Sequence, residues 1–268
     1  MTQYEFECEA YGVAFRLSAN RVSLLRMAAH RVPYGTVLKN FRPARIDGAA
    51  QFLLLELPDG EGYCLRLDGV PIGERRTLPE MLDCVGRDLM VHVANYAPEL
   101  VFVHAGVVAW QGRALILPGP SFAGKTTLVA ALVRAGAAYY SDEYAVVDAD
   151  GRVHPYARNL QMRQPGETEQ TGVSVGELGG VTDNVPLAAG YVVFCEYAAD
   201  AQWQPEAVSA GMAVLEMLRH TIPVQRTPGR VMAALTAMIA GVPALRSQRG
   251  EADEAAQKLL ALWGDGPA

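Results

Sequence analysis

A single eight-residue motif constrains the fold of this chain more than any other feature. Residues 119–126 read Gly-Pro-Ser-Phe-Ala-Gly-Lys-Thr and match the pattern G-x-x-x-x-G-K-T. An apolar run at residues 113–117 precedes the motif, and residues 126–135 show the periodicity of a helix. A strand, a glycine-rich turn and a helix in this order surround a phosphate with backbone N–H groups and the positive end of a helix dipole. The motif therefore predicts an α/β fold that binds a nucleotide.

The motif also predicts the roles of its own residues. Lys125 is expected to reach the β- and γ-phosphates as a point charge, and the Thr126 hydroxyl is expected to ligate Mg²⁺. Lysine is scarce in this chain, since only Lys39, Lys125 and Lys258 are lysines. The expected cofactors are ATP and Mg²⁺. The candidate nucleotide-binding residues are Gly119, Ser121, Ala123, Gly124, Lys125, Thr126 and Thr127.

A tight turn predicts where one histidine lies. Gln111-Gly112 is expected to be a two-residue turn between strands at residues 100–110 and 113–117, which pairs Trp110 with Arg113. The same register sets His104 opposite Gly119, at the mouth of the phosphate loop. His104 is therefore a candidate catalytic residue, and a hydrogen-bonded core histidine is the alternative.

Two adjacent acids follow the next expected strand. Residues 137–141 form an apolar run that ends at Asp142 and Glu143. In a parallel crossover this strand ends at the same edge of the sheet as the phosphate loop. One acid could then hold Mg²⁺ while the other accepts a proton from an attacking hydroxyl, and a solvated acidic turn is the alternative. Two further acids, Asp148 and Glu196, also end apolar runs and are weaker candidates for binding the metal. A hairpin turn is the better interpretation of Asp148. Five arginines could contact phosphate or an acidic acceptor, namely Arg158, Arg163, Arg219, Arg226 and Arg230.

The rest of the chain indicates two α/β parts, at residues 1–98 and 99–268. The first is expected to contain a hairpin or a bent strand within residues 6–17, a helix at 20–30 and a hairpin formed by 52–57 and 63–67. Thr77 and Glu80 match a capping box that starts a helix reaching about Asn95. The second part is expected to hold a strand at 191–197 and helices at 206–220, 229–240 and 251–263. Residues 164–186 are expected to form a long loop, which either covers the site or is an insertion.

Composition excludes several classes of protein. The chain of 268 residues carries 23 Lys and Arg against 29 Asp and Glu, so no general positive field would hold it to nucleic acid. The longest apolar stretch, residues 231–245, is too short to span a bilayer and contains a proline. The N-terminal residues have no signal-peptide pattern, and the four cysteines form no CxxC pair. We expect a cytoplasmic protein without a nucleic-acid or membrane partner.

The spacing of these features resembles a known family. Val103-His104-Ala-Gly, the hairpin, the phosphate loop and residues 137–143 together look like the catalytic domain of HPr kinase/phosphorylase, over about residues 100–160. That family carries a histidine before its phosphate loop and an Asp-Asp pair after the following helix. The resemblance implies a P-loop kinase core with a mixed sheet, related in fold to phosphoenolpyruvate carboxykinase, plus a smaller N-terminal α/β unit. It also implies that Asp142 is the catalytic base and a metal ligand, that Glu143 and Thr126 bind the metal, and that His104 and Lys125 act at the transferred phosphate.

The expected function is phosphoryl transfer from ATP to a hydroxyl of a peptide, a protein or a small molecule. The chain departs from the family at Phe122, where glycine is frequent, and it has no counterpart of the later Glu-containing signature. It is more similar to the diverged HPr-kinase-like proteins of bacteria, and this leaves the acceptor and a homo-oligomeric state open. A nucleotide-binding regulatory or scaffold protein with weak ATPase activity is the alternative. A phosphotransferase that uses pyrophosphate or ADP is a third hypothesis.

Overall fold

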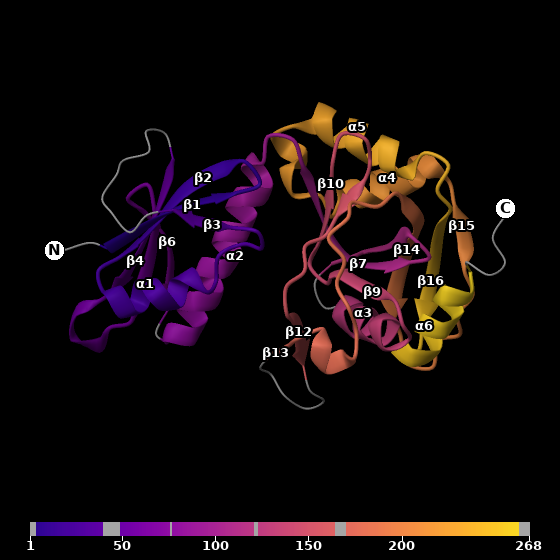
Figure 1. Ribbon diagram of the computed structural model, residues 1–268, viewed down its shortest axis with the longest axis horizontal. Coiled ribbons are helices and arrows are strands. Elements are labelled where there is room, and N and C mark those ends of the chain that lie inside the picture. The colour runs from indigo at the N-terminus through magenta and orange to yellow at the C-terminus, as the bar shows by residue number, and fades with distance from the viewer. Residues whose placement is uncertain (1–3, 40–48, 76, 121–122, 164–169, 263–268) are drawn as a thin grey trace. The chain divides into compact units, whose positions relative to one another are not determined.

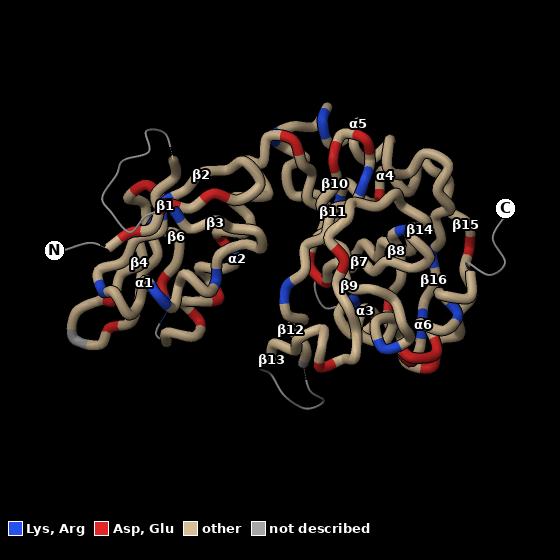
Figure 2. Tube along the Cα trace, viewed as in Figure 1, with Lys and Arg blue, Asp and Glu red and all other residues tan. Residues whose placement is uncertain are grey.

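The computed structural model describes residues 4–39, 49–75, 77–120, 123–163 and 170–262 (Figure 1). The chain divides into two compact units, Met1–Glu99 and Leu100–Ala268. Each unit is mixed α/β and has its own sheet. Short acidic and basic segments are scattered over the trace of both units (Figure 2). No helix among the described residues is long and apolar enough to cross a membrane.

The first unit is a six-stranded sheet in the order β3-β1-β2-β4-β5-β6 with two helices. Its pairs are antiparallel except for β2 with β4. The pairing of β4 with β5 confirms the predicted hairpin, and the pairing of β1 with β2 shows that residues 6–17 form a hairpin rather than a bent strand. The predicted capping box is also confirmed, because the Glu80 carboxylate accepts from the backbone N–H and the hydroxyl of Thr77. The elements are β1 (Tyr4–Ala10), β2 (Val13–Ala19), α1 (Val22–Ala29), β3 (Val37–Lys39), β4 (Ala50–Glu56), β5 (Tyr63–Leu67), β6 (Val70–Arg75) and α2 (Leu78–Tyr96).

The second unit is built on an eight-stranded mixed sheet. Its order is β11-β10-β7-β8-β14-β16-β15, and β9 pairs with β7. Strands β8, β14 and β16 are parallel, whereas β7 is antiparallel to its three partners. The elements are β7 (Val101–Trp110), β8 (Arg113–Pro118), α3 (Lys125–Arg134), β9 (Ala138–Ser141), β10 (Tyr144–Val147), β11 (Val153–His154), β12 (Leu160–Arg163), β13 (Gln170–Val173), β14 (Ala189–Tyr197), β15 (Glu206–Val208), α4 (Ala210–Leu218), α5 (Pro228–Ile239), β16 (Ala244–Arg249) and α6 (Ala252–Ala261).

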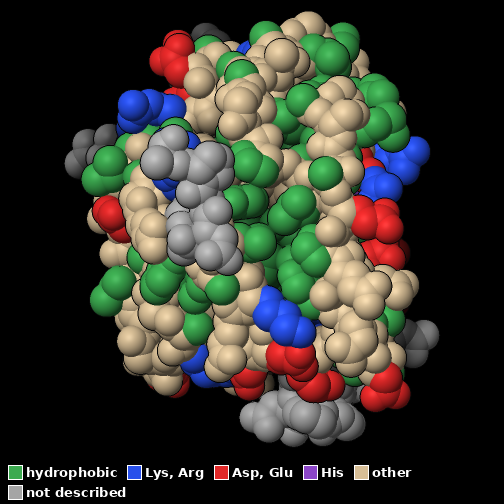
Figure 3. Space-filling view, turned by 90° about the vertical axis from the view of Figure 1, so that its right-hand side faces the viewer, with side chains coloured by type: hydrophobic (Ala, Val, Ile, Leu, Met, Phe, Trp, Pro, Cys, Tyr) green, Lys and Arg blue, Asp and Glu red, His purple; other side chains and the backbone are tan. Residues whose placement is uncertain are grey.

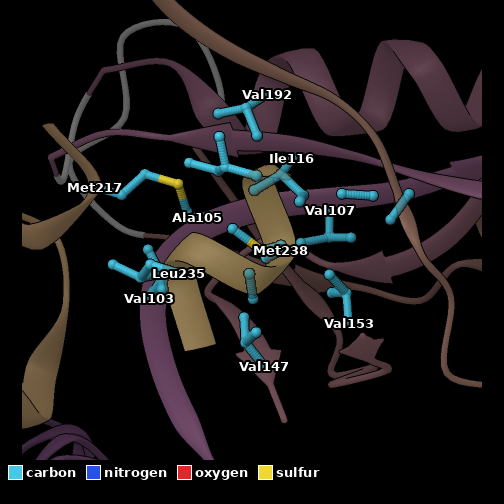
Figure 4. Packing of buried hydrophobic residues seen from close by; sticks show 14 of the residues in the cluster. Val103, Ala105, Val107, Ile116, Val147, Val153, Val192, Met217, Leu235 and Met238 are labelled. Atoms are coloured by element: carbon cyan, nitrogen blue, oxygen red, sulfur yellow. The ribbon is translucent and has the colours of Figure 1, made fainter. Parts of the chain in front are cut away.

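Helices cover both faces of this sheet. Successive side chains of a strand point to opposite faces, so Val103, Ala105 and Val107 pack with α4 and α5 (Figure 4), while Val108 packs with α3 and α6. Gly106 faces α3 at close range, because a Cβ atom there would lie 2.6 Å from Val129 Cγ2. Figure 3 shows apolar side chains between small groups of both charges on one face of this unit. The three layers hold β8 and α3, the two elements that flank the phosphate loop, in fixed positions.

Two sequence-based predictions for this unit are wrong in part. The expected helix at 206–220 begins only at Ala210, because Glu206–Val208 pairs with β16 and Ser209 caps the helix by accepting from the Met212 backbone N–H. The expected loop at 164–186 contains β13, which pairs with β12, and a short 3-10 turn at Gly176–Leu178. Residues 164–169 of that loop lie outside the described residues.

Candidate functional site at the phosphate loop

The phosphate loop connects the end of β8 to the start of α3. The predicted register of the preceding hairpin is confirmed, since Trp110 pairs with Arg113 and the Gly119 N–H donates to the His104 carbonyl at 3.4 Å. Gly124 is the N-cap of α3 and has a φ of 80°, in the left-handed region that favours glycine. The helix then begins at Lys125, and its first N–H groups face the loop. Ser121 lies outside the described residues.

Lys125 is buried within the loop that it follows. Its Nζ donates to the carbonyl oxygens of Gly119 at 2.9 Å and Pro120 at 2.6 Å. Burial lowers the pKa of Lys125 to about 8, against the opposing effect of Glu143 and Asp142. Backbone oxygens therefore hold the ammonium at the loop, and an anion in the loop would raise its pKa and favour its charged form further.

Asp142 lies beside Thr126 at the base of α3. The Asp142 carboxylate accepts from the Tyr139 hydroxyl at 2.9 Å, from the Thr126 hydroxyl at 3.2 Å and from the Gln161 backbone N–H at 3.3 Å. Burial raises the pKa of Asp142, and these three hydrogen bonds oppose the rise. The end of β9 lies at this edge of the sheet, as predicted from the sequence. Tyr139 and Gln161 fix the orientation of the carboxylate and were not among the predicted site residues.

Glu143 follows in a turn that Ser141 stabilises. The Ser141 hydroxyl oxygen accepts from the backbone N–H groups of Glu143 at 3.0 Å and Tyr144 at 2.9 Å. The Glu143 carbonyl accepts from the Ala105 N–H of β7 at 3.1 Å. Burial and the adjacent Asp142 raise the pKa of Glu143, whereas the positive charge of Arg158 lowers it. The two neighbouring acids are thus held in one buried turn at the mouth of the loop.

His104 is half-buried at the same mouth. Its backbone N–H donates to the His220 carbonyl at 2.7 Å, and its register partner across the sheet is Tyr144. Burial and then the charges of Lys125 and His220 lower the pKa of His104 to about 4. His104 is therefore neutral near pH 7, and His220 is a second histidine near Lys125 that sequence reasoning missed.

Arg249 supports the loop from β16 and was also missed. Its guanidinium donates to the Gly124 carbonyl at 2.9 Å and to the Gly250 carbonyl at 2.9 Å, and it lies over the Tyr197 ring at 5.3 Å from the ring centre. The side chain is 3% exposed. Because the peptide bond is planar, fixing the Gly124 carbonyl also fixes the direction of the Lys125 N–H, which is one of the donors that would face a phosphate.

A polar cleft of about 400 Å³ opens beside the loop. Gly119, Pro120 and Ala123 form one wall, and the ends of β14 and β16 with part of α4 form the other. It is lined by Pro118, Gly119, Pro120, Ala123, Phe194, Cys195, Glu196, Gln202, Gln204, Glu206, Glu216, His220, Arg246, Ser247 and Gln248. The cleft thus borders the phosphate loop on the β14 side and also reaches His220, whose carbonyl accepts from the His104 backbone N–H of β7.

The structure places the remaining candidates in different surroundings. Asp148 accepts from the backbone N–H groups of Asp150 and Arg152 and contacts His154 at 2.8 Å, so it stabilises the turn between β10 and β11. Thr127 is exposed on α3, and Glu196 lines the cleft. Among the arginines, Arg158 acts on the pKa of Glu143, Arg219 lies near His220, and Arg230 donates to Thr227.

Comparison with known proteins adds little to this geometry. No protein-family model matches the chain, and no curated protein matches it. The solved structures that match include the Hpr(Ser) kinase/phosphatase from Coxiella burnetii, at 10% sequence identity and a TM-score of 0.33. The match covers 61% of this chain and 94% of that chain. At this identity and TM-score the likeness is distant.

Proposed function

We propose that the chain is an ATP- and Mg²⁺-dependent kinase that transfers the γ-phosphoryl group to a hydroxyl. The acceptor is a serine or threonine of a peptide or protein, or a small-molecule alcohol. The observation that carries this proposal is the buried Asp142 carboxylate, which accepts from the Thr126 hydroxyl at 3.2 Å in a site that also holds Lys125. A phosphate-binding lysine, a hydroxyl for the metal and a carboxylate at one edge of a sheet are the parts that phosphoryl transfer requires.

The donor set suits Mg²⁺. This cation prefers oxygen ligands and usually binds through one or two carboxylates together with phosphate oxygens and water. Thr126, Asp142 and Glu143 would hold it, and when bound it neutralises charge on the phosphates. Among the described residues no group of three or more His, Cys, Asp and Glu could hold a metal. We therefore expect Mg²⁺ to bind together with the nucleotide.

Asp142 is suited to accept a proton. Burial raises the pKa of its carboxyl, which makes the carboxylate a stronger base than an exposed aspartate. In the proposed reaction the acceptor hydroxyl gives its proton to Asp142 and its oxygen bonds to the γ-phosphorus. The bond from that phosphorus to the β-bridging oxygen breaks, and ADP leaves. Lys125 stabilises charge on the phosphates, and the neutral His104 acts as a hydrogen-bonding group near them.

The test is phosphate transfer by matched aspartate variants. The full chain is incubated with ATP labelled at the γ-phosphate, Mg²⁺, serine and threonine peptides and small alcohols. Asp142→Asn should bind ATP and lose transfer by a factor of about 10² to 10⁴, the usual contribution of a general base. Asp148→Asn is the control, because Asp148 also follows an apolar strand but stabilises a turn. Transfer at the wild-type rate by Asp142→Asn would contradict the role of this residue. Binding of ATP by the wild type without transfer to any acceptor would favour a regulatory nucleotide-binding protein.

A further inference from the structure

The cleft beside the phosphate loop has a polar lining that the proposed reaction does not use. The register of the parallel strands β14 and β16 pairs Glu196 with Gln248, and both side chains are exposed at the cleft. Gln204 lies beside them, because its backbone N–H donates to the Ser247 hydroxyl of β16 at 3.0 Å. The cleft thus presents a carboxylate and carboxamides next to a loop expected to hold phosphates.

The sheet order determines which part of a nucleotide reaches this cleft. This step rests on the proposed function. Strands β7 and β14 lie on opposite sides of β8, the strand that enters the phosphate loop. Asp142 and Glu143 follow β9 on the β7 side, so a terminal phosphate that reacts there faces away from β14. The nucleoside at the other end of the phosphate chain must then extend toward β14 and into the cleft.

The chemistry of the cleft suits hydroxyl groups better than an aromatic base. The phenyl ring among the lining residues, Phe194, is 7% exposed and offers almost no face for stacking. Glu216 forms an ion pair with Arg246, which leaves Glu196 and Glu206 as carboxylates that disfavour an acidic ligand. Carboxylate and carboxamide oxygens accept hydrogen bonds from hydroxyls, and the carboxamide N–H₂ also donates.

We propose that this cleft binds the ribose of the nucleotide through its 2′- and 3′-hydroxyls, with Glu196 and Gln248 as the recognising side chains, and that it discriminates weakly between bases. Both residues lie near the ends of paired strands, so the sheet sets their backbone positions before the nucleotide binds. The ribose then adds affinity beyond what the phosphate loop gives to phosphates alone.

Calorimetric titration of the full chain with four probes tests this proposal in the presence of Mg²⁺. The probes are ATP, GTP, 2′,3′-dideoxy-ATP and inorganic triphosphate. ATP and GTP should bind with dissociation constants within a factor of about three, and dideoxy-ATP should bind about tenfold more weakly, as the loss of a hydrogen bond to a charged group implies. Glu196→Ala should weaken the binding of ATP to the level that dideoxy-ATP shows with the wild type, and it should leave the affinity for triphosphate unchanged. Gln248→Ala should do the same to a smaller degree.

The outcomes separate this proposal from the proposed function. Equal affinity for ATP and dideoxy-ATP, with triphosphate still bound, overturns the ribose site alone. A preference of more than about tenfold between ATP and GTP overturns the weak discrimination between bases. If Glu196→Ala lowers the affinity for triphosphate as much as the affinity for ATP, the substitution acts on the phosphate loop, and this result also overturns the ribose site. Absence of binding by all four probes overturns the proposed function and the ribose site together.

Discussion

Substituting Gly124 by alanine tests how tightly β16 fixes the phosphate loop. Gly124 has a φ of 80°, and a Cβ atom built on it would lie 2.6 Å from Nη2 of Arg249. The same guanidinium donates to the Gly124 carbonyl at 2.9 Å. An alanine at this position must therefore adopt a left-handed backbone and also displace the arginine from its hydrogen bond.

The size of the effect follows from these two contributions. A left-handed conformation costs a non-glycine residue about 1–2 kcal/mol. Displacing the guanidinium loses a hydrogen bond from a charged donor, which is worth about 1.5–3 kcal/mol. Gly124→Ala should then lower the free energy of unfolding by about 2.5–5 kcal/mol, which corresponds to a decrease in Tm of roughly 5–20 °C for a unit of this size.

A double-mutant cycle isolates the contact with Arg249. Thermal unfolding is followed by circular dichroism for Gly124→Ala, Arg249→Met and the double variant. Methionine keeps most of the apolar stem but does not reach the position of Nη2, so the double variant has no clash. Its destabilisation should be smaller than the sum of the single effects by about 1–3 kcal/mol. Strict additivity, or a Gly124→Ala variant as stable as the wild type, would refute the reasoning.

Three further predictions follow from the site and its support. Burial raises the pKa of the Asp142 carboxyl in the folded protein above its value in the unfolded chain. The free energy of unfolding therefore falls as the pH rises from the unfolded-state pKa through the folded-state pKa. The change in Tm from the wild type to Asp142→Asn should therefore be more favourable at pH 7 than at pH 4, because the charge penalty depends on pH whereas the hydrogen bonds of the replaced oxygen are lost at both. A less favourable change at pH 7 would contradict this. The pKa of Lys125 is lowered to about 8 from 10.5, and a bound phosphate favours the charged form. Nucleotide binding should therefore take up protons between pH 8 and pH 10.5, and the affinity should weaken as the pH rises. Calorimetry in buffers of different ionisation enthalpy measures this uptake, and its absence at pH 9 would contradict the prediction. Gly106→Ala brings a Cβ atom to 2.6 Å from Val129 and should destabilise the chain by about 1–3 kcal/mol in urea unfolding. Adding Val129→Ala to the Gly106→Ala variant should restore part of the lost free energy of unfolding. A double variant with no such recovery would contradict the packing argument.

Local signals in the sequence predicted a large part of the site. Gln111 and Gly112 both have positive φ, so the two-residue turn fixed the register that brings His104 to Gly119. The motif and the crossover rule predicted that Asp142 and Thr126 would lie close together, and they lie within hydrogen-bonding distance. Their catalytic and metal-binding roles stay predictions.

Long-range contacts explain what the sequence could not predict. Strand β16 has a polar second half, and the burial of Ser247 and Arg249 arises from their contacts with Gln204 and Gly124. No local pattern shows those contacts, since Gly124 lies 125 residues from Arg249 in the chain. The expected helix at 206–220 began too early for the same reason, because Glu206–Val208 is a strand only through its pairing with β16.

The central claim is that the loop at residues 119–126 holds the phosphates of a nucleotide, and equilibrium binding of ATP with Mg²⁺ tests it without knowledge of the acceptor. Calorimetry should show binding by the wild type that inorganic triphosphate competes away. Lys125→Met should weaken binding roughly ten- to hundredfold, because it removes charged hydrogen bonds to phosphate. The Lys258→Met control should bind as the wild type, since Lys258 pairs with Glu254 on α6. Absence of ATP binding by the wild type, or equal binding by Lys125→Met, would contradict the claim.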